Sequence, residues 1–448
     1  MKPMNSCRII KKIFFLVCLT VSFFANAQEN TYTLKQCLEI GLDKNYEIQI
    51  IRNQQQILEN DASAGNAGYL PTLDLSSSYS GTLNNLLEQR MLSGEITDYN
   101  NTLNQSFNAG VNLNWTIFDG LGVQMNYKRL KQLQEQGELN TRLTIENFIS
   151  NFTADYYNYI SQTIRQKNLQ YSVKLSEERL RIVDASYTIG SMSRLDLQQA
   201  KVDLNSDKSS LIKQDEVIYL LQMQLNELMG NENIEKLLFI ADSIISINSS
   251  LNKEELYEQM LNNNTLLQIY KQGEILAKID LKNQQSENYP YLRLNAGYGY
   301  TYNTYQTSSF DRQKNLGLNY GVTLGYTIFD GMNRKRKQQN AKIELMNSEL
   351  EYQQAEIAVK VNFANAWMAY QNNLRLIELE ENNLETAKDN YDIAIERYKL
   401  GQLSGIELRE AQNSLFSAEE RLVEAKYNIK LCEISLLQIS GKVGTYLE

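Results

Sequence analysis

The side chains of this chain that could do chemistry are mostly carboxylates. The 448 residues include 53 aspartates and glutamates but no histidine, so the usual general base near neutral pH and the commonest metal ligand are missing. Glu407 and Glu410 lie three residues apart and therefore share one face of a helix. Such a pair attracts cations and repels anions. The alternative is an ordinary solvated acidic face.

The cysteines and glycines give no support for catalysis. Cys37 and Cys432 lie far apart, each in a helical pattern, and we interpret both as small core residues, with a disulfide between them as the disfavoured alternative. No phosphate-binding glycine loop occurs. We therefore predict a protein that is not an enzyme and has no cofactor and no metal site. One reproducible turnover would overturn this prediction.

The N-terminus predicts export. Residues 1–27 have the pattern of a signal peptide, with a basic start, an apolar core from Ile13 to Ala25 and a small-residue cleavage site at Ala25-Asn-Ala27. Lipidation at Cys18 is a weak alternative, because this cysteine lies inside the apolar core. The segment carries four basic residues, which leaves 40 basic and 53 acidic residues after cleavage. An acidic chain without basic clusters disfavours nucleic acid as a partner.

The acidic pair at 407 and 410 belongs to a helix with an unbroken seam of small and apolar residues in steps of three and four. This spacing is typical of coiled-coil packing. The corresponding helix earlier in the chain carries Asp207 and Gln214 on its seam, so the two halves are not interchangeable. The seam consists of Leu408, Ala411, Leu415, Ala418, Leu422, Ala425, Ile429, Cys432, Leu436 and Ile439.

Two halves of the chain repeat each other. The segment from Trp115 to Gly120 reappears, as Tyr326 to Gly331, 211 positions later. A strand-to-helix junction that recurs at one fixed offset indicates a duplicated fold. We predict a first structural repeat over 28–230, a linker over 231–251 and a second repeat over 252–448. The same offset relates Tyr187 to Tyr398, Gly190 to Gly401, Ser193 to Ser404, Ala200 to Ala411 and Gly230 to Gly441.

Each repeat contains a predicted β-hairpin, over 70–118 and 290–329. Pro71 and Pro290 end the preceding helical patterns. Apolar residues then alternate with Gly, Ser, Asn and Thr in strands of about ten residues, and a long loop is expected over 81–105. Lipid outside and water inside would produce this alternation. A soluble sheet on a core is equally compatible with the strand pattern, but the secretory signal and the long helices favour the membrane.

A long helical pattern follows each hairpin, and Asp119 is the expected cap of the first free amides of the first one. From Leu121 to about Tyr187 nothing interrupts it, so the helix would extend about 100 Å. Gly190 suits the left-handed position after a helix, and Ser193 can cap the return helix from Arg194 to about Met229.

Four strands per chain cannot close a barrel, and an open sheet edge in lipid leaves backbone amides unsatisfied. Several copies must therefore share one barrel. Two copies give eight strands and a filled interior, whereas three copies give twelve strands and room for a pore. The long helices would then line a tunnel.

The whole sequence after the signal resembles the TolC-type outer-membrane efflux proteins. The features that carry the resemblance are the duplicated helix–hairpin–long helix–return helix order, the prolines before the strands, the paired Thr-Ile-Phe-Asp-Gly junctions and the Tyr-x-x-Gly-x-x-Ser turns. The resemblance implies an α+β membrane protein: a homotrimer with a twelve-stranded β-barrel in the outer membrane, continued by an antiparallel α-helical coiled-coil tunnel. It also implies an exit duct of a tripartite export system, with a periplasmic adaptor and an inner-membrane transporter as partners.

The resemblance also assigns roles to residues. In that family a tyrosine, an arginine and two rings of acidic side chains at the second turn close the tunnel. Tyr398 matches the tyrosine, and Glu407 and Glu410 match the acidic pair. The arginine position is Leu403 here. Residues at the helix turns would lie near adaptor-docking grooves: Gly190, Ser193, Gly401 and Ser404. The barrel–helix junctions would be Trp115, Phe118, Asp119 and Gly120, with Tyr326, Phe329, Asp330 and Gly331.

Other interpretations stay open. Type I protein secretion differs from drug efflux by partner rather than by any residue that the sequence identifies. A secreted coiled-coil scaffold with soluble hairpins is the alternative from a different class. The basic run Arg334–Lys337 is interpreted as a solvated helix face rather than a specific site.

Overall fold

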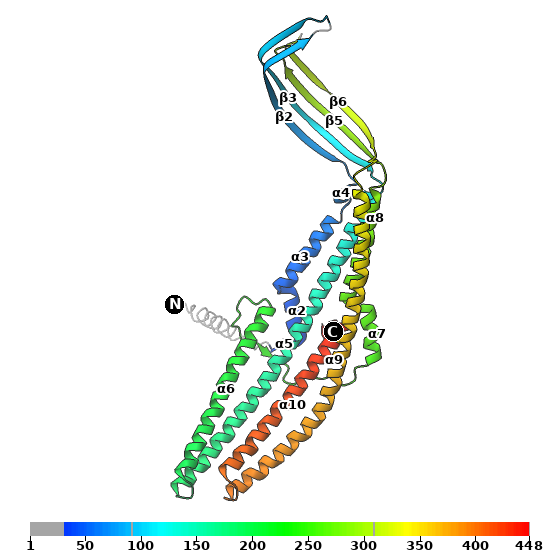
Figure 1. Cartoon of the computed structure of the whole chain (residues 1–448). Helices are drawn as coiled ribbons and strands as arrows, with labels where there is room; N and C mark the ends of the chain where they lie inside the picture. Colours follow the sequence, from blue (N-terminus) through cyan, green and yellow to red (C-terminus); the bar gives the residue numbers. More distant parts are fainter. Residues whose placement is uncertain (1–30, 91–92, 308–309, 448) are drawn as a thin grey trace, which may run out of the picture. The chain divides into compact units, whose positions relative to one another are not determined.

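A computed structural model describes residues 31–90, 93–307 and 310–447 of the chain. The predicted signal peptide, residues 1–27, lies outside this range. Within it, helical segment, hairpin, long helix and return helix follow one another twice, as predicted (Figure 1). In the described part of the chain, no helix combines the length and the apolar character needed to cross a bilayer.

The helices account for most of the described residues. The two long helices have 67 residues each, and the two return helices have 35 each. The helices are α2 (Leu34–Lys44), α3 (Tyr46–Asp61), α4 (Ala64–Ala67), α5 (Gly122–Thr188), α6 (Arg194–Leu228), α7 (Lys253–Asn263), α8 (Thr265–Ser286), α9 (Asn333–Lys399), α10 (Gly405–Ile439) and the short 3₁₀ helix η2 (Val443–Leu447).

The strands form two sheets. In the linker between the repeats, β4 (Phe239–Ile240) pairs in parallel with β1 (Thr31–Tyr32), a pairing that the sequence did not predict. The larger sheet is antiparallel throughout, in the order β2-β3-β5-β6, so the two hairpins join side by side. Its strands are β2 (Thr72–Arg90), β3 (Ile96–Phe118), β5 (Tyr291–Thr304) and β6 (Arg312–Gly325).

The described residues fall into two compact units, each of which draws on both halves of the sequence. Unit 1 takes residues 31–49, 144–264 and 360–447, and unit 2 takes residues 50–143 and 265–359. Unit 2 contains the four-stranded sheet, and unit 1 contains both turns between a long helix and its return helix.

The first hairpin is longer than predicted. The expected loop over 81–105 is wrong, because the ladder between β2 and β3 continues to the pair Arg90↔Ile96. The strands have 19, 23, 14 and 14 residues rather than about ten. A period of two is visible only where a single face is apolar. In this outer part apolar residues lie on both faces, with Leu83 and Leu87 on one and Leu86 on the other, so the alternation signal disappears.

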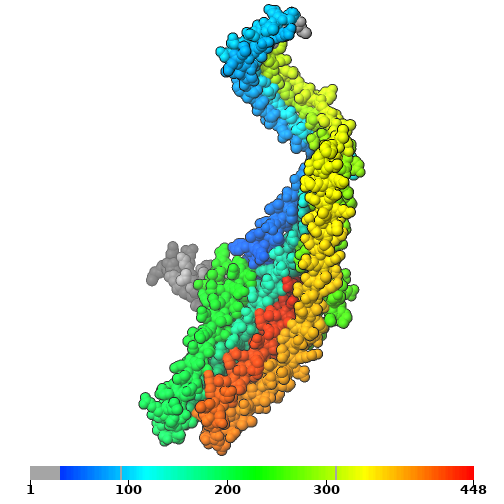
Figure 2. Space-filling view, in the orientation of Figure 1, coloured from blue at the N-terminus to red at the C-terminus, as the bar shows by residue number. Residues whose placement is uncertain are grey.

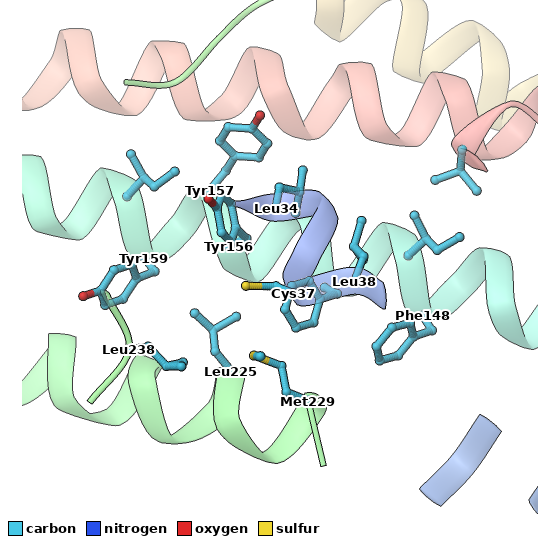
Figure 3. Packing of buried hydrophobic residues seen from close by; sticks show 14 of the residues in the cluster. Leu34, Cys37, Leu38, Phe148, Tyr156, Tyr157, Tyr159, Leu225, Met229 and Leu238 are labelled. Carbon is cyan, nitrogen blue, oxygen red and sulfur yellow. The ribbon is translucent and has the colours of Figure 1, made fainter. Parts of the chain in front are cut away.

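The core of unit 1 forms where α2, α5, α6 and the linker meet (Figure 3). Leu38 of α2, Phe152 and Tyr156 of α5 and Leu225 of α6 are almost fully buried there. Cys37 lies among them as a free thiol whose pKa burial raises to about 12, which confirms its interpretation as a core residue. Cys432 is free and half-buried.

The opening helical segment of each repeat is divided into two helices by one asparagine. Asn45 adopts an extended conformation between α2 and α3, and its amide donates to the carbonyl of Leu228 at the end of α6 (3.0 Å). Asn264 repeats this arrangement between α7 and α8, donating to the carbonyl of Ile439 (2.8 Å). Each asparagine thus satisfies one of the free carbonyls at the end of a return helix.

Helices α9 and α10 are also joined by ion pairs. Figure 2 shows α10, in red, lying along α9, in orange. Ion pairs Arg421–Glu380 (3.0 Å) and Lys426–Glu381 (3.5 Å) join the two helices. All four residues belong to unit 1.

Candidate functional site

The two helix turns have the same local construction. Gly190 and Gly401 adopt positive φ angles of 82° and 72°, as expected for a left-handed residue after a helix. Ser193 caps α6 and Ser404 caps α10, each within a capping box. The prediction that these four residues form the turns is therefore confirmed, and so is the cap role of Ser193.

The capping box of α10 uses one of the two predicted gate carboxylates. Oε2 of Glu407 accepts hydrogen bonds from the backbone N–H of Ser404 (2.9 Å) and from its hydroxyl (2.7 Å). These bonds, with the charge of Arg397, lower the pKa of Glu407, so its charge persists at neutral pH. Glu410 is exposed one turn further along α10. The sequence did not assign this structural role to Glu407.

Tyr398 is not exposed with the two glutamates. Its side chain is 3% exposed, within a cluster that includes Val183, Tyr391 and Leu408. The hydroxyl of Tyr398 lies 3.8 Å from the sulfur of Met192 in the first turn. Burial raises the pKa of this phenol. Within one chain, Tyr398 therefore joins the second turn to the first, and Leu403 packs against the same cluster.

A polar cluster near the helix turns joins α5, α6 and α10, and the sequence did not predict it. Arg409 of α10 donates from both terminal nitrogens to Asp207 of α6, at 2.6 and 2.8 Å. Ser176 of α5 donates to the same carboxylate at 2.5 Å, and Gln412 donates to Ser176 at 3.1 Å. The sequence signal was Asp207 itself, a carboxylate on a seam of apolar residues. Only the fold identifies its partner.

The first strand–helix junction, which the sequence predicted as a barrel–helix junction, packs closely within unit 2. The indole N–H of Trp115 donates to the carbonyl of Tyr69 (2.9 Å). The carboxylate of Asp119 accepts from the backbone N–H of Val123 (3.0 Å), so it caps the first turn of α5 as predicted. Phe118 is the last residue of β3.

The second junction is more open. The strand ends at Gly325, so the prediction that Tyr326 continues it is wrong; the ladder between β5 and β6 stops at Tyr291↔Gly325. Asp330 accepts from the backbone N–H of Arg334 (2.7 Å), whose guanidinium donates to the carbonyl of Thr327 (2.6 Å). The basic run is therefore partly structural. Phe329 is exposed.

The glycines of the two junctions provide a matched test. Gly120 and Gly331 have similar φ angles of 76° and 70°, but an added methyl group would meet the carbonyl oxygen of Ser286 only at Gly120. At Gly331 the nearest atom is 3.7 Å away. We expect Gly331→Ala to lower the free energy of unfolding by about 1 kcal/mol and Gly120→Ala by about 2–4 kcal/mol. Thermal melts of both variants measure this, and equal losses would contradict it.

The sheet of unit 2 has two unlike faces. One face presents large apolar side chains to the outside, and its opposite face carries mainly Asn, Gly, Ser and Thr. An apolar surface of this extent marks a contact with lipid or protein. Its most exposed members are Leu73, Leu75, Tyr79, Leu316, Leu318, Tyr320, Val322 and Leu324.

A two-faced antiparallel sheet combined with two helices about 100 Å long, each followed by a shorter return helix, defines a class of protein: the outer-membrane channel with a helical extension. The sequence profile of the family described as outer membrane efflux protein matches residues 40–231 and 256–442. The chain belongs to this outer membrane efflux protein family. It is thus an outer-membrane exit duct for export, as the sequence predicts, and its family consists of channels rather than enzymes.

Individual relatives are distant but cover most of the chain. OpmQ of Pseudomonas aeruginosa, a pyoverdine export outer membrane protein, is 20% identical over 393 residues, which cover 87% of this chain and 80% of OpmQ. The outer membrane efflux protein BepC of Brucella suis is 21% identical over 352 residues, 78% of this chain and 74% of BepC. The solved CmeC outer membrane channel of Campylobacter jejuni has the same fold, with a TM-score of 0.76 at 18% identity over 91% of this chain and 85% of CmeC.

Proposed function

We propose that three copies of the chain form one twelve-stranded barrel and one helical tunnel, through which solutes leave the cell. The observation that carries this proposal is the four-stranded sheet, which has free edges at β2 and β6 and an exposed apolar face. In lipid both edges must be paired. Pairing β6 of one copy with β2 of the next satisfies them, and three copies leave room for a pore.

Exposed apolar residues on the helices support association of copies. In unit 2, Ile343, Met346, Leu350 and Ile357 of α9 are exposed and recur at steps of three, four and seven. Such a stripe on a helix normally faces another helix. We propose that a second copy covers it.

The helix turns are the proposed docking point for a periplasmic adaptor, which would connect the duct to an inner-membrane transporter. Around Gly190, Ser193, Gly401 and Ser404 the turns present Ile189, Leu400 and Ile406, all strongly exposed. An adaptor with an apolar tip fits this surface. The partners remain those of the sequence prediction: homotrimer, adaptor, transporter and outer-membrane lipid.

Type I protein secretion and small-molecule efflux are both compatible with this geometry. The name of OpmQ refers to pyoverdine export, which favours a small-molecule substrate here as well. Genes for an ATP-driven exporter next to this one would favour protein secretion, and genes for a proton-driven pump and adaptor would favour efflux. A secreted scaffold fits poorly with the family.

The carboxylates at the second turn are proposed to form a cation-binding mouth. In a trimer, Glu407 and Glu410 place six carboxylates around it. We expect Glu407→Gln with Glu410→Gln to weaken block of single-channel current by multivalent cations added on the helix side. Glutamine at 407 keeps an oxygen for the capping box, so the turn is preserved.

A control separates this effect from a general loss of charge. Glu420→Gln with Glu424→Gln removes the same charge further along α10 and should leave the block unchanged. Unaltered block in the 407/410 variant would rule out the mouth. Absence of any conductance from the wild-type protein would rule out the duct itself.

A further inference from the structure

We propose that a hollow on the polar face of the four-stranded sheet binds primary ammonium groups of the solutes that pass through the duct. The inference rests on the proposed function, because it requires this face to line the water-filled barrel. The hollow belongs entirely to unit 2.

The hollow has a volume of about 470 Å³ and a floor of backbone. One row of paired residues crosses it: Asp74 opposite Asn112, then Gly297, then Asn319. Because Gly297 has no side chain, the middle of the row is left open. Its polar lining comes from Asp74, Asn112, Asn114, Asn295 and Asn319.

The polar atoms around Gly297 are acceptors. Asn112 donates its amide N–H to the hydroxyl of Ser76 (3.0 Å), and this bond turns its oxygen towards Gly297. A methyl group placed on Gly297 would lie 2.8 Å from that oxygen and would also meet the amide oxygen of Asn319. Two amide oxygens therefore lie above the floor, with the carboxylate of Asp74 next to them in the row.

The charge of the hollow is negative. Asp74 is the charged residue of its lining, and its carboxylate accepts a hydrogen bond from the neutral hydroxyl of Thr72 at 3.4 Å. Arg293 lies on the same face of β5, but its guanidinium lies over the ring of Tyr291 (4.5 Å), towards the start of the strand and away from Gly297. The guanidinium of Arg293 is thus directed away from the hollow.

These features select the chemistry of the ligand. An ammonium group carries three donors and no acceptor, which matches the two amide oxygens at Gly297, and the carboxylate of Asp74 adds negative charge to the same row. Mg²⁺ and Ca²⁺ require more oxygen ligands in a closer geometry than one carboxylate and two amides supply. Binding in a solvated duct is weak, which a transported solute requires because it must also leave.

The test uses single-channel recordings of the full-length protein, with 1,4-diaminobutane added on the side of the hairpin turns. We expect the diamine to block the wild-type current and 1,4-butanediol, of the same length but uncharged, to have no effect. Asp74→Asn should weaken the block at least about tenfold, since a charge-assisted hydrogen bond is lost. The open-channel current of each variant shows that the barrel is assembled.

Two glycine variants provide a second, independent arm. Gly297→Ala places a methyl group against the amide oxygens of Asn112 and Asn319 and should weaken the block as much as Asp74→Asn does. Gly317→Ala lies on the same face, where an added methyl group meets nothing closer than 3.8 Å, and should leave the block unchanged. The 407/410 glutamine variant should also keep it, because the helix turns are a different site.

Three results would overturn the inference. Block of Asp74→Asn and Gly297→Ala at wild-type concentrations would place the diamine elsewhere. Equal block by Mg²⁺, weakened by the same variants, would make the hollow a site for inorganic cations only. A wild-type protein without conductance would overturn the proposed duct, and the inference with it.

Discussion

Replacing Arg409 with alanine is expected to lower the free energy of unfolding by about 3 kcal/mol. The side chain of Asp207 is only 10% exposed, and its carboxylate receives both terminal nitrogens of Arg409. Alanine would leave this charge buried with only the hydroxyl of Ser176 as a partner. The midpoint of thermal unfolding in detergent measures the loss.

Two variants sharpen this experiment. Arg181 makes an ion pair of similar length with Glu178 (2.7 Å), but both side chains are exposed, so Arg181→Ala should change stability little. Replacing the buried pair together, Arg409→Met with Asp207→Leu, should recover most of the loss, because no charge is then left unpaired. A melting curve of Arg409→Ala that coincides with the wild type would contradict the account.

The second large effect concerns neighbouring residues on opposite faces of β6. Leu318 lies on the exposed apolar face and Asn319 on the polar face that contains the hollow. If the apolar face contacts lipid, Leu318→Arg should destabilise the barrel by about 2–4 kcal/mol, since arginine is unfavourable at the bilayer midplane. Less protein should then appear in the outer-membrane fraction.

Asn319→Arg is the matched control for Leu318→Arg. The same side chain one position along points to the other face, where it should permit assembly but lower the conductance for cations. Normal assembly of Leu318→Arg together with failure of Asn319→Arg would reverse the assignment of the two faces.

Local signals in the sequence were sufficient for the turns and caps. Ser193 and Asp119 were predicted as caps because each residue type and its position suffice to satisfy free amides at a helix start. The strand faces were likewise visible wherever apolar residues alternate with polar ones. The duplication followed from one fixed offset.

Features that depend on contacts distant in sequence could not be predicted. The role of Asn45 and Asn264 at the ends of α6 and α10 is one of these, because the carbonyls that they bind lie 183 and 175 positions away. In the outer part of the first hairpin, apolar and polar residues occur on both faces, so no period of two is visible. Asp207 was identified as an exception on its seam, but nothing local connects it to Arg409, 202 positions away.

The resemblance to a known family identified residues of the second turn but not their contacts. Sequence matching placed Tyr398, Glu407 and Glu410 together as a gate, whereas in one chain Tyr398 is buried against the first turn and Glu407 completes a capping box. Matching positions identify residues of the same type at the same place. They do not show which atoms of a residue already form hydrogen bonds or are buried within its own chain.

The central claim is that three chains share one barrel, and native mass spectrometry of the protein extracted from the outer membrane tests it most directly. The account predicts a complex with the mass of three chains, which has twelve strands and room for a pore. A stable single chain would contradict it, because the edges at β2 and β6 would be unpaired in lipid. A dimer would also contradict it, since eight strands enclose an interior that side chains fill.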